Sequence, residues 1–155
     1  MITHAQARSM AEMNWGRGGT SSSRTNRKGA FYFSCSSHGG FVIDGRALTD
    51  AERSLMKEYI TPEAGTEVVR QDGSVRRFRS PMSLQSLKYY PNSETLRDVE
   101  IFFAEEDCDW AIPAVIAGIM VDRMTLDAAV ETFKRWRGVS NHEVTQILAK
   151  RSETC

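Results

Sequence analysis

The sequence lacks net charge, paired cysteines and long apolar runs, and each shortage excludes a class of protein. Its 20 basic side chains balance its 20 acidic ones, which argues against a surface built throughout to bind DNA and against an acidic DNA mimic. No apolar run approaches the roughly 18 residues that span a bilayer. The first residues also lack the basic-then-apolar pattern of a secretory signal. We therefore expect a cytoplasmic protein that does not enter a membrane.

Catalytic and metal-binding fingerprints are scarce too. The three cysteines, Cys35, Cys108 and Cys155, are odd in number and far apart, which fits neither a disulfide framework nor a paired zinc motif. The chain contains no H-E-x-x-H, no C-x-x-C and no glycine-rich phosphate loop. We expect free thiols, and we predict no metal and no cofactor.

At 155 residues the chain has the length of one domain, and no linker or internal repeat divides it. The hydrophobic patterns predict one α+β domain over residues 1–155: a small, largely antiparallel sheet with helices packed on one face and a helical C-terminal third. Strands are expected at 30–35, 41–43, 66–70, 75–79 and 99–103, and helices at 4–13, 49–60, 106–120, 125–137 and from 140 onwards.

Capping signals mark the starts of three of these helices. Thr49 with Glu52, and Ser140 with Glu143, form capping boxes, in which a hydroxyl and a carboxylate satisfy backbone amides of the first turn. Thr125 can cap the helix between them.

Two segments are rich in basic residues. The first, near residues 16–29, has almost nothing to bury and is expected to be a flexible loop. The second is a hairpin at 66–79, where Asp72-Gly73 between two β-prone runs is the strongest hairpin signal in the chain. Both suit a solvated surface, and both could contact an anionic partner such as nucleic acid. The first segment carries Arg17, Arg24, Arg27 and Lys28, and the second carries Arg70, Arg76, Arg77 and Arg79.

The most distinctive stretch begins at the apolar run 101–103. Four carboxylates follow at once, around Cys108, and an apolar helix comes after them, in which Pro113 should cause a kink. Negative charge is favourable at a helix N-terminus, so these carboxylates could simply begin that helix. We call them the acidic corner: Glu105, Glu106, Asp107 and Asp109.

A second distinctive stretch is the turn Ser37-His38-Gly39-Gly40. A lone histidine in such a turn is most often a polar residue bonded to nearby backbone, and it could also be a general base, a metal ligand or a binding contact. If the turn packs beside the acidic corner, His38 and the carboxylates could hold a divalent metal that activates water. Alternatively, His38 could deprotonate Cys108. The hydrolase candidates are therefore His38, Glu105, Glu106 and Cys108.

Two other interpretations of this juxtaposition need no catalysis. A carboxylate could bond the amides of the glycine turn and lock it to the helix, with Cys108 and Trp110 as core residues. The acidic corner could also be a protein-binding surface, together with the four hairpin arginines. At the other end, Phe133 and Trp136 are expected in the core, although exposed aromatics there could anchor a homodimer.

The turn Ser37-His38-Gly39-Gly40 and the segment Glu105-Glu106-Asp107-Cys108-Asp109-Trp110-Ala111 together resemble an uncharacterised family of small proteins from phages, plasmids and other mobile elements. The similarity covers residues 33–118. The family tends to have an aromatic residue directly before Glu-Glu-Asp, where this chain has Ala104.

This resemblance implies a genomic setting that favours proteins that disarm bacterial defences. The first hypothesis is a phage-type inhibitor that binds a host defence protein, such as a Cas-type complex, in the bacterial cytoplasm. The second is a metal- or thiol-dependent hydrolase, and the third is a nucleic-acid-binding protein.

Overall fold

The computed structural model describes residues 1–16, 20–35, 38–60, 67–69, 75–77, 100–107 and 109–153. Among these residues, no helix is both long enough and apolar enough to cross a membrane. Several positions named above lie outside the described residues: Arg17, Arg70, Arg79, Cys108 and Cys155.

The fold is built on a four-stranded antiparallel sheet, which confirms the predicted α+β class. Its strands are β1 (Ser21–Ser23), β2 (Ala30–Ser34), β3 (Gly39–Asp44) and β6 (Ile101–Glu105), in the spatial order β1-β2-β3-β6. The predicted hairpin forms a separate two-stranded sheet of β4 (Glu67–Val69) and β5 (Val75–Arg77).

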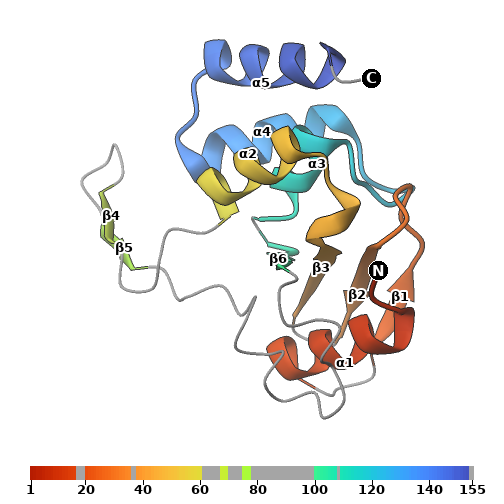
Figure 1. Ribbon diagram of the computed structural model, residues 1–155. Coiled ribbons are helices and arrows are strands. Elements are labelled where there is room, and N and C mark those ends of the chain that lie inside the picture. The colour runs from red at the N-terminus through yellow and green to blue at the C-terminus, as the bar shows by residue number, and fades with distance from the viewer. Residues whose placement is uncertain are drawn as a thin grey trace.

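Helices cover both faces of the four-stranded sheet (Figure 1). On one face, α1 (His4–Trp15) packs against β2 and β3. On the other lie α2 (Asp50–Ile60), α3 (Ala111–Ala117) and α4 (Leu126–Arg137), while α5 (Asn141–Glu153) packs on α3 and α4 as an outer layer. A short 3-10 helix, η1 (Gly45–Ala47), joins β3 to α2.

Because side chains alternate along a strand, the central strands contribute to two cores. Tyr32 and Phe41 belong to the core under α2–α5, and Phe33 belongs to the smaller core under α1. The apolar run of β6 serves both, since Phe102 lies in the first core and Ile101 in the second. This explains why β6 reads as continuously apolar rather than alternating.

The predicted capping box forms in full at the start of α2 and in part at the start of α5. The amide of Thr49 donates to the carboxylate of Glu52 at 2.9 Å, and the amide of Glu52 donates to the Thr49 hydroxyl at 3.1 Å. At the start of α5, the amide of Glu143 donates to Ser140 at 3.2 Å. The Glu143 carboxylate accepts a hydrogen bond from the Tyr59 hydroxyl, so the Glu143 side chain ties α5 to α2.

The expected helix 106–120 is wrong in extent. It is shortened to Ala111–Ala117, because β6 continues through Glu105 and the described residues between β6 and α3 form a turn. The predicted kink at Pro113 is absent because Pro113 is the third residue of α3, where a backbone N–H would have no intrahelical acceptor. Gly118, in the left-handed conformation with φ 65°, ends the helix.

The expected loop 16–29 is wrong at residues 21–23. Ser21–Ser23 form an edge strand on β2. The Asn26 side chain donates to the Gly118 carbonyl at 2.8 Å. Contacts with β2 and with Gly118 therefore hold this segment in place, although it has few apolar side chains of its own.

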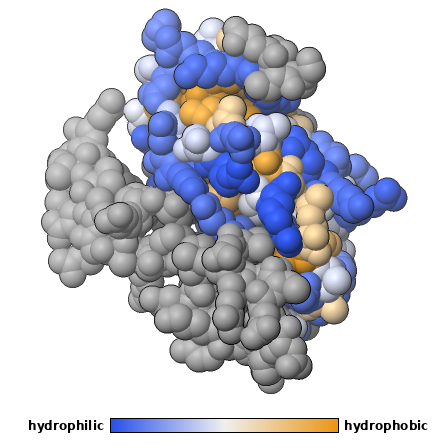
Figure 2. Space-filling model, in the orientation of Figure 1, coloured by the Kyte–Doolittle hydropathy of each residue, from blue (hydrophilic) through white to orange (hydrophobic). Residues whose placement is uncertain are grey.

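The two aromatic residues of α4 differ in burial. Phe133 is buried as predicted, whereas Trp136 is 40% exposed, so its placement in the core was wrong. Among the coloured atoms in Figure 2 the hydrophilic ones predominate, and apolar atoms gather beneath α5 and in a second group lower on the same face.

Candidate functional site

The pairing of β3 with β6 brings the histidine turn and the acidic corner together. Gly40 lies opposite Glu105 in the register, and the Glu106 amide donates to the Gly39 carbonyl at 2.9 Å. The His38 Nδ1 atom lies 3.4 Å from a carboxylate oxygen of Glu105. The juxtaposition considered from the sequence is therefore present, although the backbone of Glu106, rather than a carboxylate, makes the bond to the turn.

Both glycines of the turn are required because β3 lies very close to the backbones of its two neighbouring strands, β2 and β6. A Cβ on Gly39 would lie 2.4 Å from the Phe33 carbonyl oxygen, and one on Gly40 would lie 2.0 Å from the Ala104 carbonyl oxygen. Gly40 also has φ 150°, which L-residues rarely adopt. The glycine pair thus has a structural explanation: it lets β3 fit between β2 and β6.

The His38–Glu105 pair is a surface feature. The His38 side chain is 51% exposed and the Glu105 side chain is 39% exposed, so solvent screens the interaction. The Cys35 thiol lies 2.6 Å from the His38 carbonyl oxygen, which places that thiol against the backbone of the turn.

Two residues that the sequence did not suggest lie near the acidic corner. The guanidinium carbon of Arg123 lies 5.0 Å from the ring centroid of Tyr32, within the range of a cation–π contact. Burial raises the pKa of the Tyr32 hydroxyl, the Glu106 and Asp107 carboxylates raise it further, and Arg123 opposes them. Tyr32 could have been found from its inward position on β2, whereas Arg123 carries no sequence signal.

Asp109 does not belong to the exposed part of the acidic corner. It forms an ion pair with Arg137, and the two side chains are only 18% and 9% exposed. We therefore assign Asp109 a structural role instead of the partner-binding role considered from the sequence, because the pair ties the turn before α3 to the end of α4. Three carboxylates remain at the surface: Glu105, Glu106 and Asp107.

The described residues contain no group of three His, Cys, Asp or Glu side chains arranged to hold a metal ion. The thiol considered for hydrolysis, Cys108, lies outside the described residues. What the described site offers is an imidazole, three partly or fully exposed carboxylates and a guanidinium at one end of a sheet. That arrangement is suited to binding a charged surface.

The basic segment near residues 16–29 divides into structural and exposed cations. Arg27 pairs with Glu52 at 3.1 Å and donates to the Ala117 carbonyl at 2.8 Å. Because these contacts occupy its guanidinium, we assign Arg27 a structural role instead of the nucleic-acid contact considered from the sequence. Arg24 and Lys28 are exposed, and neither has an ion pair among the residues that the structure describes.

Comparison with known proteins adds nothing to these findings. No family model, no curated protein and no solved structure matches the chain. The residues of the site are therefore the basis for any functional conclusion.

Proposed function

We propose that the chain is a non-enzymatic binding protein that docks its surface carboxylates, Glu105, Glu106 and Asp107, onto a basic surface of a protein partner. The observation that supports this is the division of roles within the two motifs. The glycines and backbone of the turn are used in strand pairing, whereas the carboxylates stay at the surface.

The backbone that carries these carboxylates is held in a way that favours binding. Glu105 ends β6, and the Glu106 backbone amide donates a hydrogen bond to the Gly39 carbonyl, so little backbone freedom is lost when a partner docks. Complementary charge then accelerates and orients association.

The second region that we assign to the interface is the arginine-rich segment around β4 and β5. Arg76 and Arg77 belong to β5, and the other two arginines of the segment come from the sequence alone. A basic region in addition to the acidic corner would let a partner with both kinds of charge dock in one orientation. The four arginines are Arg70, Arg76, Arg77 and Arg79.

The kind of partner comes from the sequence resemblance. A mobile-element protein that acts by binding is suited to inhibiting a host defence protein, and we propose a Cas-type complex in the bacterial cytoplasm. Such an inhibitor needs neither a cofactor nor a catalytic group, because it acts by occupying a surface of its target.

The test uses bacteria that carry an active CRISPR–Cas system and a phage that the system targets. Expression of the chain should raise the plaquing efficiency of the targeted phage, and purified chain should co-elute with the purified Cas complex. The double variant Glu106→Gln/Asp107→Asn should lose both effects while keeping the wild-type circular dichroism spectrum.

A matched control removes two exposed carboxylates from α4, in Asp127→Asn/Glu131→Gln, and should retain both effects. Inhibition that survives Glu106→Gln/Asp107→Asn would contradict the proposed surface. Unchanged plaquing with wild-type chain in every CRISPR–Cas type tested would contradict the proposed partner class.

A further inference from the structure

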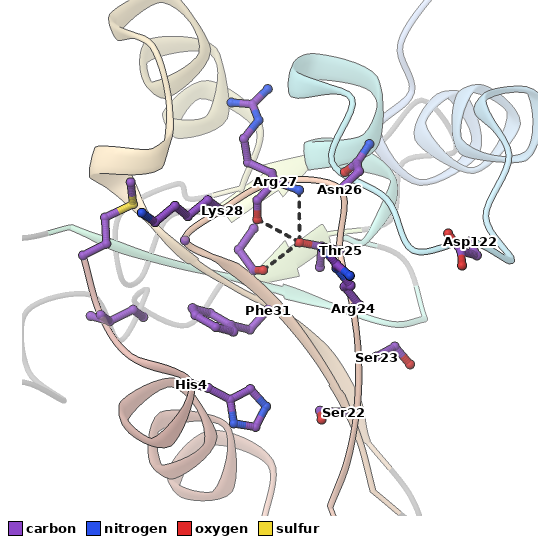
Figure 3. Close-up of a pocket in the computed structure, with 14 residues that line it drawn as sticks. His4, Ser22, Ser23, Arg24, Thr25, Asn26, Arg27, Lys28, Phe31 and Asp122 are labelled. Carbon is purple, nitrogen blue, oxygen red and sulfur yellow. Dashed lines mark hydrogen bonds between the residues drawn. The ribbon is translucent and has the colours of Figure 1, made fainter.

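A groove of about 1080 Å³ runs along the edge strand β1 and the loop 24–29, at a different place from the acidic corner. Its walls come from the start of α1, from β1, from the loop and from the first residues of β2 (Figure 3). This edge groove is comparable in size to the larger pockets that hold small ligands. Nothing in the proposed function uses it.

The shape of the edge groove is fixed by hydrogen bonds beneath its surface. The Thr25 hydroxyl donates to the Ala30 carbonyl at 2.7 Å and accepts from the Arg27 amide at 3.3 Å (Figure 3). Arg27 holds the loop down on Glu52 and Ala117. The loop is therefore preformed for a ligand, which lowers the entropic cost of binding.

The charge of the groove favours an anion. Arg24 and Lys28 are exposed and line it, and neither forms an ion pair within the part of the chain that the structure describes. The N-terminal end of the 12-residue helix α1 reaches the groove through His4, which adds the positive end of the helix dipole. One carboxylate, Asp122, lines the groove away from Phe31 and His4 (Figure 3).

The groove also contains flat rings. Phe31 is partly exposed there, and the exposed His4 ring meets it edge-on with the ring centroids 5.8 Å apart. Proteins that bind single-stranded nucleic acid combine cations along the phosphate backbone with aromatic rings on which bases stack. Phe31 also packs against the smaller core under α1, so it is the exposed part of its ring, beside the two cations, that the groove offers to a ligand.

From these contacts we propose that the edge groove binds single-stranded nucleic acid, with Arg24 and Lys28 on phosphates and Phe31 and His4 against a base. This activity goes beyond the proposed function and uses none of its residues. The chain would then carry two separate binding surfaces, one for a protein partner and one for a nucleic-acid strand.

Fluorescence anisotropy with a labelled ten-nucleotide oligo(dT) and a matched ten-base-pair duplex tests this proposal. The single strand should bind at least about tenfold more tightly than the duplex, because bases must be unstacked to reach Phe31. The variant Arg24→Glu/Lys28→Glu should weaken oligo(dT) binding at least about tenfold. Replacing Arg24 and Lys28 by Ala should reduce the salt dependence of log K by about 1.4, since each cation on a single strand contributes about 0.7.

Three further variants separate this site from general electrostatics. Phe31→Leu keeps an apolar side chain and should still weaken oligo(dT) binding severalfold. Asp122→Asn removes a repulsive charge and should strengthen it. The matched charge control Arg135→Glu/Lys150→Glu, on α4 and α5, should leave the affinity within about twofold once the salt concentration reaches about 0.15 M, where distant charges are screened.

Equal binding of strand and duplex, or a Phe31→Leu affinity equal to wild type, would overturn the proposal. So would competition by an acidic peptide as strong as by unlabelled oligo(dT), because that result would make the groove a site for acidic protein segments. If the α4–α5 control lost as much oligo(dT) affinity as Arg24→Glu/Lys28→Glu, the binding would depend on net charge alone, which would also overturn the proposal. The anisotropy assay tests only the edge groove, whereas plaquing and co-elution with the Cas complex test only the acidic corner. Failure of one proposal is therefore distinguishable from failure of the other.

Discussion

Gly40 and Ala104 lie so close that a Cβ added to Gly40 would stand 2.0 Å from the Ala104 carbonyl oxygen. The contact joins the histidine turn to the strand that ends in the acidic corner, and the atom that the Cβ would strike belongs to the backbone. A side chain at this position cannot be accommodated by rotating a neighbour.

We therefore expect Gly40→Ala to destabilise the protein by more than about 3 kcal/mol or to prevent folding, since strain and strand separation add together. Gly138→Ala is the matched control. Gly138 also has a positive φ, of 62°, but nothing lies within 4 Å of an added Cβ, so its cost should be only about 1 kcal/mol. Urea unfolding of both variants measures the difference, and equal midpoints would contradict it.

The Arg27–Glu52 pair should contribute strongly to stability. The Glu52 side chain is only 10% exposed, so Arg27→Met would leave a nearly buried carboxylate without its cationic partner, although the Thr49 amide still bonds it, at a cost of about 3 kcal/mol. The control Arg24→Met changes an exposed side chain near the start of the same loop and should stay within about 0.5 kcal/mol of wild type. Thermal and urea unfolding test this, and a small effect of Arg27→Met would show that the pair does not anchor the loop.

Asp44 should give the protein an acid-sensitive component of stability. Burial alone would raise the pKa of Asp44, but hydrogen bonds from the Arg46 side chain and the Ile2 amide outweigh it and lower the pKa below its ordinary value of 3.8. Because the folded pKa is depressed, the stabilisation is fully present above pH 3.8 and is lost as the pH falls through the folded pKa.

Asp44→Asn should therefore cost about 2 kcal/mol at neutral pH, since hydrogen bonds to a charged group are lost. Its stability difference from wild type should shrink as the pH falls below 3.8. Urea unfolding at a series of pH values measures this difference. A gap that stays constant from neutral to strongly acidic pH would contradict the assigned role.

His38 should be dispensable for folding. Its pair with Glu105 is exposed on both sides, and such pairs contribute at most about 1 kcal/mol. His38→Ala should therefore stay close to the wild-type unfolding midpoint and retain phage protection, because binding uses the carboxylates. A stable His38→Ala protein that has lost protection would favour the hydrolase hypothesis, and metal analysis with Cys108→Ala would follow.

The local parts of this fold could be predicted from the sequence. The Thr49–Glu52 box, the Thr125 cap and the strand at Ala30–Ser34 rest on contacts between residues a few positions apart, or on a strongly apolar pattern. Such signals need no knowledge of the remaining chain. They also located both motifs of the candidate site.

The sequence could not show β1 or the role of Arg27. Ser21–Ser23 have no apolar alternation, and they form a strand only because β2 offers a partner. Arg27 resembled its exposed neighbours until Glu52 and Ala117, from two distant helices, were placed beside it.

The length, the even charge balance, the α+β class and the helix caps at Thr49 and Thr125 were determined by the sequence itself. Only the tertiary structure decided which charged groups are available. Asp109 is engaged by Arg137, and Arg27 is engaged by Glu52, while Lys28 stays at the surface. The physical reason is that an ion pair depends on distance in space, and contacts between remote segments form only when the β3–β6 pairing and the helix packing are complete.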